Sequence, residues 1–434
     1  IRNLFVIALS AIVSLTCYST ASRNRYANLF AEALETIESQ ALQNVPRDEL
    51  FAYAMDGMTS RLDGHSRYIA GEMFRLFDED IQQQFGGVGM YVENEPGTGK
   101  LIVLTPIPGA PAFDAGIKSG DIILAIDGQD TQAMDRGDAV KLIRGPRGEP
   151  VEVLVSRNGE KKSFELVRDM IREPSAHGDF RSGDGSWNFV LKDYPKIGYI
   201  RLLQFGSESS TEIKKALEEI GPEVDSLILD LRNNTGGLLD SAIEICDFFL
   251  EPDKTIVKIR GRGDQLLEHY YSKDEPVLST EKPVVILINR DSASASEIVS
   301  ACLQDHGRAI LIGENTWGKG TVQNVIPIEQ GKSALKLTTA SYWRPSGINI
   351  DRYDKEARKT GIWGVQPNDG FEIELDDKTI FDNRRLRYFL DLRGLISPEN
   401  LEQREDQSVE KIIDEPLNRA IEFLNNQDQK RVAA

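Results

Sequence analysis

The chain has 434 residues, of which 40% are hydrophobic and 8% aromatic, a length and composition that allow roughly three domains with sizeable cores. Acidic residues outnumber basic ones by 69 to 51, which gives a formal net charge of −18. Binding to the phosphate backbone of nucleic acids requires a surplus of Lys and Arg on a surface. We therefore expect no nucleic-acid partner.

The N-terminus carries an uncharged apolar run, residues 4–17, directly after Arg2. This run is short for a membrane-spanning helix, which needs about 20 residues, but is typical of the core of a signal peptide. Small residues for cleavage follow at 19–21. We predict that residues 1–22 are a signal peptide and that the protein is exported to a periplasmic or other extracytoplasmic space. An uncleaved membrane anchor is the alternative.

Three cysteines, Cys17, Cys246 and Cys302, show no CxxC spacing for zinc or redox chemistry. Cys246 and Cys302 lie in apolar, helix-like segments, and we expect buried free thiols there. A disulfide between them is the alternative in an oxidising compartment. The sequence predicts no metal site and no cofactor.

Residues 23–83 are predicted to be mainly helical. Apolar residues keep a three-to-four spacing along 29–41, and a similar pattern continues over 50–62. The segment Asp63–Ser66 interrupts the pattern, and a second helical stretch is expected to reach about residue 84. The first helices could mediate a homo-oligomer or pack on the chain's own core.

Glycine usage rises abruptly at residue 85 and marks the start of a β-rich module, residues 84–170. Short strands are predicted at 101–104, 122–126 and 151–155, with one amphipathic helix at 139–143.

From residue 197 onward, strands and helices alternate, which predicts an α/β domain with a mostly parallel sheet and helices on its faces. Residues 321–328 and 334–339 are expected to form an appended antiparallel pair. Residues 376–434 are polar and helix-prone in places, and no chemistry is assigned to them. The predicted strands are 197–203, 226–231, 284–288 and 309–312, and the predicted helices are 213–220, 238–250 and 295–304.

A run of small hydroxyl residues, Ser292 to Ser296, lies where strand 284–288 passes into a helix. Ser294 would occupy the first turn, where unpaired backbone N–H groups and the helix dipole favour negative charge. A tetrahedral oxyanion formed on an attacked carbonyl would be stabilised there. The alternative is that these serines only cap the helix.

A single lysine, Lys319, lies between Gly318 and Gly320. A lysine can serve as the base of a serine nucleophile only if burial lowers the pKa of its amine. The glycines and the neighbouring Trp317 suit such burial, and Gln323 could hold the amine by a hydrogen bond. The alternative is an exposed, inert lysine in a glycine turn.

Two competing chemistries fit the residues less well. Residues 313–319 match GxxxxGK, but Gly320 replaces the Ser or Thr that would bind magnesium, and a strand rather than a helix is predicted next. The chain contains neither HExxH nor GxSxG. His306, at the end of the helix after Ser294, is expected to act as a helix C-terminal cation.

Three motifs, residues 230–239, 292–297 and 318–323, resemble those of the carboxy-terminal processing proteases, the S41 serine peptidases. The resemblance implies an α/β fold with a crotonase/ClpP-like core at 171–375, an inserted PDZ domain at 84–170, and helical N- and C-terminal segments. It also implies that Ser294 is the nucleophile, at a spacing of 25 residues (319 − 294) from the general base Lys319, and that Gln323 orients that base.

The same resemblance implies an oxyanion hole formed by the N–H groups of Gly237 and Ala295, with Gly236 as an alternative to Gly237.

In the PDZ domain, the turn Gly86-Gly87-Val88-Gly89 would bind the terminal carboxylate of a peptide that pairs with the adjacent strand. The resemblance also implies a role for Arg144, which matches a family arginine that couples the position of the PDZ domain to the active site. The alternative for Arg144 is a solvated turn residue.

The predicted function is therefore a serine endopeptidase that cleaves protein substrates with accessible C-termini, without a cofactor, and that could be tethered to a membrane through its N-terminus. One alternative is a catalytically idle PDZ scaffold that binds peptides. Another is a crotonase-like enzyme acting on acyl-coenzyme A.

Overall fold

The computed structural model describes residues 24–71, 73–74, 77, 79, 84–95, 98–107, 109–132, 134–172, 174–182, 185–392 and 412–433. The predicted signal segment, residues 1–22, lies outside these ranges. The chain divides into two compact units, a smaller one formed by 1–74 with 323–338 and a larger one formed by 75–322 with 339–434. Among the described helices, none has the length and hydropathy needed to cross a membrane.

The smaller unit combines helices with the tip of a β-hairpin. Its elements are α2 (Arg25–Gln40), α3 (Arg47–Thr59), β1 (Arg67–Ala70), most of β20 (Thr321–Ile328), the 3-10 turn η2 (Glu329–Gly331) and the first half of β21 (Ser333–Trp343). Asn24 caps α2 by accepting from the N–H groups of Tyr26 and Ala27.

The predicted helix after Ser66 is wrong for residues 67–70, which form β1 and pair antiparallel with β21. Tyr68 and Ile69 favour a strand once a partner edge is present, and Ile69 is buried there.

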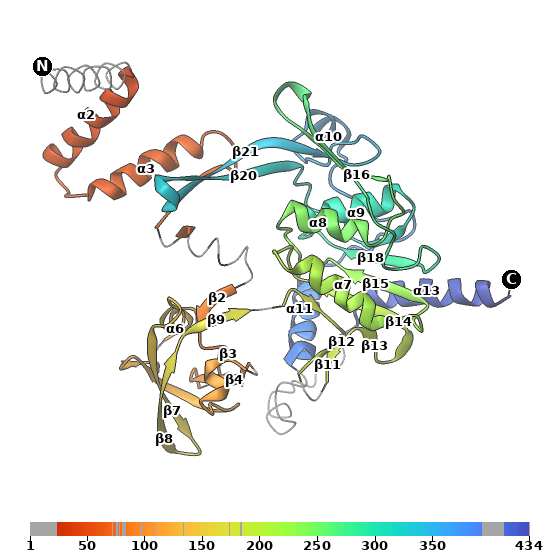
Figure 1. Cartoon of the computed structure of the whole chain (residues 1–434), viewed down its shortest axis with the longest axis horizontal. Coiled ribbons are helices and arrows are strands. Elements are labelled where there is room, and N and C mark those ends of the chain that lie inside the picture. Colours follow the sequence, from red (N-terminus) through yellow and green to blue (C-terminus); the bar gives the residue numbers. More distant parts are fainter. Residues whose placement is uncertain are drawn as a thin grey trace, which may run out of the picture. The chain divides into compact units, whose positions relative to one another are not determined.

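The β-rich module spans residues 84–172 of the larger unit (Figure 1). Its strands surround a core of its own, in which Val88, Val103, Ile126 and Val153 are fully buried. Its elements are β2 (Gln84–Gly87), β3 (Met90–Asn94), β4 (Leu101–Pro106), α5 (Pro111–Asp114), β5 (Ile122–Ile126), β6 (Gln129–Asp130), α6 (Arg136–Ile143), β7 (Pro150–Arg157), β8 (Glu160–Val167) and β9 (Asp169–Arg172).

The rest of the larger unit, the sheet domain, is built on parallel strands in the order β14-β15-β18-β19. Short strands β10 and β13 pair antiparallel with β14. The predicted parallel sheet is thus confirmed, with its strands at β14 (Tyr194–Leu202), β15 (Ser226–Asp230), β18 (Val284–Ile288) and β19 (Ala309–Gly313) and the edge pieces at β10 (Ala176–His177) and β13 (Val190–Leu191).

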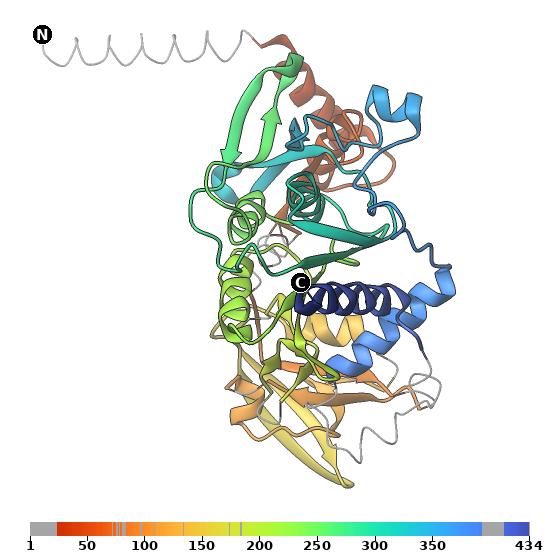
Figure 2. The same cartoon turned by 90° about the vertical axis from the view of Figure 1, so that its right-hand side faces the viewer.

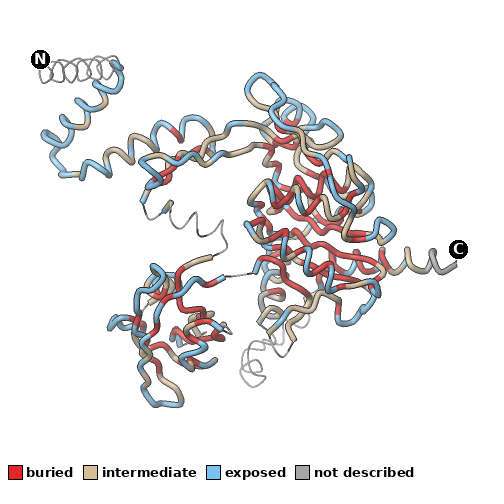
Figure 3. The backbone as a smooth tube through the Cα atoms, in the orientation of Figure 1, coloured by how far each residue is buried: buried red, intermediate tan, exposed pale blue. Residues whose placement is uncertain are grey.

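Helices cover both faces of this sheet because alternate strand residues point to opposite sides. Leu229 and Ile286 pack with α7 (Ser209–Ile220), α8 (Leu239–Asp247) and α9 (Ala295–Asp305). Their neighbours Ile228 and Val285 pack with α13 (Glu415–Ala433). In Figure 2, α13 (dark blue) lies beside α11 (Asp377–Leu392, blue). Figure 3 shows the buried backbone concentrated in the sheet domain and, separately, within the β-rich module.

A second set of strands flanks α9. The C-terminal end of β21 pairs antiparallel with β16 (Thr255–Arg260), which in turn pairs with β17 (Leu266–Tyr271). The predicted strands at 321–328 and 334–339 are confirmed as β20 and β21, which pair with each other. The remaining elements are β11 (Phe180–Arg181), β12 (Trp187–Asn188), η1 (Arg262–Asp264) and α10 (Lys355–Thr360).

Candidate active site

Ser294 lies at the N-cap of α9, immediately after the loop that leaves β18. Its backbone has φ 57° and ψ −115°, a region that a residue with a side chain rarely occupies. Strain of this kind persists only where the surrounding structure imposes it, and it occurs often at functional sites. The residue is only 5% exposed.

The three serine hydroxyls of the run have different surroundings. Ser292 donates to the carbonyl of Leu231 (2.8 Å), and Ser296 donates to the carbonyl of Asn234 (2.8 Å). Both are therefore used to attach the start of α9 to the loop after β15. The hydroxyl of Ser294 donates to no carbonyl among the described residues, and the phenol of Tyr342 lies near it.

Tyr342 is itself buried. Burial raises the pKa of Tyr342 to about 12, while the nearby Ser294 side chain opposes that rise. Its phenol therefore stays protonated at neutral pH.

The loop after β15 approaches Ser294 closely. A Cβ on Gly236 (φ 97°) would lie 2.7 Å from the Cβ of Ser294, and one on Gly237 (φ 150°) would lie 2.1 Å from the carbonyl oxygen of Phe205. Glycine is therefore required at both positions by contact distance as well as by backbone conformation.

The N–H groups of this loop differ in availability. Gly236 donates to Oδ1 of Asn234 (2.8 Å). The N–H groups of Gly237 and Ala295 make no hydrogen bond within the part of the chain that the structure describes. Among the described residues, the N–H groups of Gly237 and Ala295 are therefore free donors, whereas the donor of Gly236 is already used.

Glu297 joins the segment around Ser294 to the lysine loop, residues 316–320. Its Oε2 accepts from the N–H groups of Ser294 (2.8 Å) and Lys319 (2.9 Å), while its Oε1 accepts from the N–H of Gly318 (2.7 Å) and the hydroxyl of Thr316 (2.6 Å). The carboxyl is fully buried. Burial raises the pKa of Glu297, and the hydrogen bonds from Thr316 and the three N–H groups oppose that rise.

Lys319 is partly buried, and this burial lowers the pKa of its amine, against the opposing charge of Glu297. The amine makes no hydrogen bond or ion pair with any described residue, Ser294 included. The main chains of Ser294 and Lys319 thus meet at one carboxylate oxygen, while the hydroxyl of Ser294 faces Tyr342.

The lysine loop is held in place by residues 349–352 and by Trp363. A Cβ on Gly318 (φ 84°) would lie 2.6 Å from Cδ1 of Trp363, and one on Gly320 would lie 2.5 Å from the N of Asp351. Trp317 is 42% exposed and lies under Arg352, whose Cζ is 5.0 Å from the ring centroid.

Gln323 belongs to the smaller unit, whereas Lys319 belongs to the larger one. Within the smaller unit, Nε2 of Gln323 donates to Oγ1 of Thr338 (3.3 Å). Its predicted contact with the amine of Lys319 stays a prediction.

The predicted peptide-binding turn, Gly86 to Gly89, runs from the end of β2 into β3. Gly86 packs directly on the main chain at Gly145, because an added Cβ would lie 2.0 Å from that carbonyl oxygen. Val88 is fully buried, and its carbonyl accepts from the N–H of Ala112. The helix α6 packs beside β3.

Arg144 follows α6, and its guanidinium lies 3.9 Å from the ring centroid of Phe85. It is thus in contact with the residue that precedes the predicted peptide-binding turn.

Three observations bear on the phosphate-binding loop, on histidine catalysis and on the cysteines. Residues 313–319 lead into strand β20 and not into a helix. The Nε2 atom of His306 lies 2.7 Å from the carbonyl oxygen of Thr255, away from Ser294. Cys246 and Cys302 are buried free thiols, as predicted, and burial raises the pKa of Cys246.

Sequence reasoning missed the roles of Glu297, Thr316 and Tyr342. The spacing from Ser294 to Glu297 fits the capping-box pattern S-x-x-E, which could have identified the bond from the Glu297 carboxylate to the Ser294 N–H. No local pattern could have identified Thr316 or Tyr342, because their contacts join separate segments.

Comparisons with known proteins agree with the predicted organisation. A profile of peptidase family S41 matches residues 196–368, and a profile of the PDZ domain matches residues 102–157. The carboxy-terminal-processing protease of Bartonella bacilliformis is 36% identical over 361 residues, which cover 81% of this chain and 79% of that protein. The carboxyl-terminal-processing protease of Picosynechococcus sp. is 33% identical over 309 residues, 70% of this chain and 71% of that protein.

Among solved structures, the photosystem II D1 C-terminal processing protease is 26% identical, with 85% of this chain and 98% of that chain covered and a TM-score of 0.43. The predicted α/β fold with an S41 core and a PDZ domain is confirmed by the two profile matches. The chain belongs to the carboxy-terminal processing proteases of peptidase family S41 and is a serine-type peptidase.

Proposed function

We propose that this peptidase cleaves protein substrates near their C-termini by means of a Ser294–Lys319 dyad. The observation that carries the proposal is the shared hydrogen-bond acceptor: Oε2 of Glu297 binds the N–H groups of Ser294 and Lys319 at 2.8 and 2.9 Å. One buried carboxylate therefore fixes the backbone of the nucleophile relative to the backbone of its base. Burial of Lys319, which lowers the pKa of the amine, supports its assignment as the base.

In the proposed reaction, the hydroxyl of Ser294 donates its proton to the neutral amine of Lys319. The Ser294 oxygen bonds to the scissile carbonyl carbon, and the N–H groups of Gly237 and Ala295 stabilise the oxyanion. Lys319 then gives its proton to the leaving amine as the C–N bond breaks. Lys319 next takes a proton from water, whose oxygen attacks the acyl-enzyme, and collapse of the second oxyanion returns that proton to Ser294.

The choice of Gly237 over Gly236 rests on the free N–H of Gly237, since the N–H of Gly236 is bonded to Asn234. Gln323 orients the amine of Lys319 in this proposal, and in doing so exchanges its bond with Thr338 for one with the amine.

The PDZ domain, residues 84–170, binds the substrate C-terminus in this proposal and gates the protease core at 171–375. The turn from Gly86 to Gly89 receives the terminal carboxylate, and Arg144, stacked on Phe85, transmits occupancy of that turn. We also propose export to an extracytoplasmic space through residues 1–22, which could remain as a membrane tether.

The test is cleavage of an unstructured reporter protein with a free C-terminus, followed by mass spectrometry of the fragments. Ser294→Ala and Lys319→Ala should each lower kcat by at least about a thousandfold, the scale seen when a nucleophile or its base is removed. Lys319→Arg is the matched control for charge, since arginine keeps the cation but cannot act as a base, and it should be equally inactive. Circular dichroism should show an intact fold in all three variants.

Near-normal turnover by Lys319→Ala would refute the assigned base. Binding of the reporter by the wild-type protein without any fragments would instead favour the idle PDZ scaffold.

A further inference from the structure

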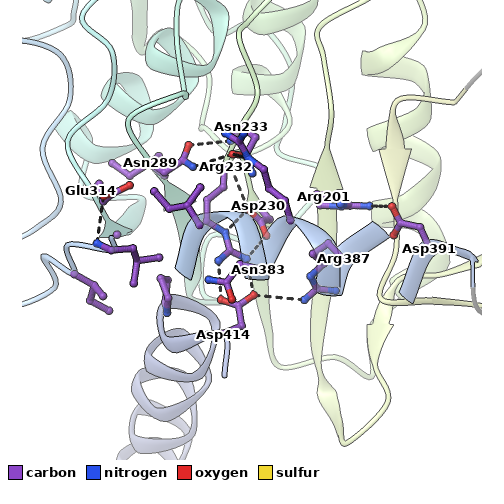
Figure 4. Close-up of a pocket in the computed structure, with 17 residues that line it drawn as sticks. Arg201, Asp230, Arg232, Asn233, Asn289, Glu314, Asn383, Arg387, Asp391 and Asp414 are labelled. Carbon is purple, nitrogen blue, oxygen red and sulfur yellow. Dashed lines mark hydrogen bonds and ion pairs between the residues drawn. The ribbon is translucent and has the colours of Figure 1, made fainter. Parts of the chain in front are cut away.

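The arginines at the carboxyl ends of the parallel strands are matched by carboxylates. In the cavity there, shown in Figure 4, Arg232 pairs with Asp230 and Asp414, both at 2.6 Å, and Arg201 pairs with Asp391. Carboxylates are abundant in the whole chain, whose formal net charge is −18. An unpaired arginine close to the candidate active site is therefore not due to a shortage of carboxylates.

Arg352 is such an arginine. Its guanidinium makes no hydrogen bond or ion pair with any residue that the structure describes, and its backbone N–H donates to the carbonyl of Gly318 (2.9 Å). The residue is half-buried, yet none of its nitrogens is among the fully buried unbonded atoms. The N–H groups of the guanidinium are therefore open to solvent, where a ligand can reach them.

Three aromatic rings surround the Arg352 guanidinium. Its Cζ lies 5.0 Å from the ring centroid of Trp317 and 5.6 Å from those of Tyr353 and Trp363. Arginine on an aromatic face gains cation–π attraction, and the N–H groups in the guanidinium plane stay available for hydrogen bonds. Trp317 is 42% and Tyr353 60% exposed, so the cluster lies at the surface. The rings thus preorganise a cation that no described carboxylate neutralises.

This aromatic cluster adjoins the lysine loop. Gly318, whose carbonyl accepts from Arg352, directly precedes Lys319, at a Cα–Cα separation of about 3.8 Å. The backbone of Arg352 thus lies one hydrogen bond and one residue from the proposed base. An extended peptide advances about 3.3 Å per residue, so substrate residues up to three positions from the scissile bond lie within roughly 10 Å of it. A substrate side chain at such a position can reach the cluster.

The segment that begins at Arg352 is basic, although the chain as a whole is acidic. Residues 352–359 contain two acidic and four basic residues, the latter being Arg352, Lys355, Arg358 and Lys359. Glu356 pairs with Lys359, and the carboxylate of Asp354 accepts from a backbone N–H at the start of α10. The local excess of positive charge therefore favours a negatively charged ligand.

We propose that Arg352 sets substrate specificity by pairing with the side-chain carboxylate of an Asp or Glu within about three residues of the scissile bond. This inference rests on the proposed function, because it takes Ser294 and Lys319 as the site of cleavage. Two N–H groups of the guanidinium donate to the two carboxylate oxygens, the arrangement in which arginine recognises carboxylates most specifically. The terminal carboxylate of the substrate is assigned to the PDZ domain, so the group at Arg352 is a side chain.

The test compares peptides that span a cleavage site mapped in the unstructured reporter. At each of the three positions on either side of the scissile bond, one peptide carries Glu and its match carries Gln, which has nearly the same shape without the charge. At one position, kcat/KM for the Glu peptide should exceed that for the Gln peptide by at least about fivefold, a ratio between those of exposed and buried charge pairs. Added salt should reduce this ratio, because the cation is open to solvent. Equal kcat/KM at every position would overturn the proposal.

Arg352→Gln should abolish the preference for Glu while kcat/KM for the Gln peptide stays close to the wild-type value. A purely structural role would lower kcat/KM for both peptides by the same factor and leave their ratio unchanged. Arg358→Gln is the matched control, because it removes a charge from an exposed position of the same basic segment, and it should keep the wild-type ratio. A preference that survives in Arg352→Gln would assign it to another group and contradict the proposal.

Two substitutions of Trp317 test the aromatic support of the guanidinium. Trp317→Phe keeps an aromatic face and should keep most of the preference, whereas Trp317→Leu should reduce it. Equal ratios in the two variants would contradict the role of the ring.

Amidated peptides distinguish the two sources of a carboxylate. Amidation of the Gln peptide removes the terminal charge and leaves the side chains unchanged. A loss of kcat/KM on amidation that Arg352→Gln erases would show that Arg352 binds the terminus, and would overturn its assignment to a side chain.

A binding measurement separates the role of Arg352 from the proposed dyad. The contact lies away from the reacting atoms, so it should contribute to binding as well as to turnover. Calorimetric titration of Ser294→Ala should therefore show the Glu peptide bound at least about fivefold more tightly than the Gln peptide. Equal affinities would overturn the inference about Arg352, whereas cleavage of either peptide by Ser294→Ala would contradict the proposed nucleophile.

Discussion

At the scale of single residues, the carboxylate of Glu297 organises the candidate active site. Every atom that approaches its two oxygens within hydrogen-bond distance is a donor: the N–H groups of Ser294, Gly318 and Lys319 and the hydroxyl of Thr316. Three of these four donors are N–H groups, which can only donate, and they favour the ionised form against the rise in the pKa of Glu297 that burial causes. The same negative charge raises the pKa of Lys319, whereas burial lowers it more strongly.

The pH dependence of activity should report Lys319. Only the neutral amine can accept the Ser294 proton, so kcat/KM should rise with pH through the pKa of Lys319. Because burial lowers this pKa, the rise should be centred below about 10.4, the ordinary lysine value. A pH–rate profile of the wild-type enzyme checks this, and a limb at the ordinary lysine value would contradict it.

Glu297→Gln should shift the rise of kcat/KM to lower pH, since the charge that raises the pKa of Lys319 is removed. It should also lower kcat/KM by about a hundredfold, because the amide group of glutamine would oppose the N–H groups that now meet at Oε2. Glu244→Gln, an exposed change on α8, is the control and should leave the profile unchanged. A limb that moves to higher pH in Glu297→Gln would show that the charge acts on another group.

The sequence predicts which residue types could perform the chemistry, but not how the main chain presents them. Ser292, Ser294 and Ser296 are equivalent by composition, and only the structure shows that the first and last donate to carbonyls of the loop after β15. For the same reason, the sequence does not show which of Gly236 and Gly237 has a free N–H, because that depends on the side chain of Asn234, to which the N–H of Gly236 donates.

At the scale of elements, β15 and α13 are joined through one buried arginine. Arg232 directly follows β15 and lies between Asp230 and Asp414, and Asp414 caps α13 by accepting from the N–H of Leu417. Burial would raise the pKa of Asp230, but the Arg232 guanidinium holds it at about 2. The attachment of α13 and the start of the loop after β15 therefore depend on the same ion pairs.

Asp414→Asn should destabilise the protein by about 2 kcal/mol, less than the loss of a sole partner because Asp230 still compensates Arg232. Asparagine can still accept from the N–H of Leu417 and cap α13, so the loss of stability reports the removal of the Asp414 charge alone. Glu415→Gln, an exposed neighbour, is the control and should be nearly neutral. Chemical denaturation measures both, and equal stability of the two variants would show that the ion pair contributes nothing.

The loss of folding stability at acidic pH should also report the lowered pKa of Asp230. A carboxyl whose pKa is lower in the folded than in the unfolded chain contributes stability above its unfolded value, about 3.9, and loses it as pH falls through the folded value. For Asp230 this loss should extend from about pH 4 to pH 2 and amount to about 2 kcal/mol. Asp230→Asn should flatten this part of the stability–pH curve, and an unchanged slope would assign the acid sensitivity to other carboxyls.

Periodicity predicts most elements because each helix and strand of the sheet domain buries a face. It failed where tertiary contacts decide: β1 is a strand because β21 supplies its partner edge. The sequence predicts no function for residues 376–434. The contact that gives this segment a structural role pairs Asp414 with Arg232, which lies 182 residues earlier in the chain. No local pattern carries that information.

At the scale of the whole molecule, the PDZ domain has a core that uses only its own residues. Every buried member of that core, from Val88 to Leu166, lies between the paired strands β2 and β9, which close the domain where the chain enters and leaves it. A core of this kind can form without the sheet domain, which has separate clusters on its two faces.

Residues 84–172 should therefore fold alone and bind a peptide with a free C-terminus. We expect a single cooperative thermal transition for this fragment. If the turn at Gly86–Gly89 binds the terminal carboxylate, as proposed, an amidated peptide of the same sequence should bind at least about tenfold more weakly, because a charged acceptor for the backbone N–H groups is lost. Isothermal titration of both peptides provides the measurement, and a scrambled peptide with a free carboxylate separates recognition of the terminus from recognition of the side chains. Equal affinity for the free and amidated peptides would place the peptide-binding surface elsewhere in the domain.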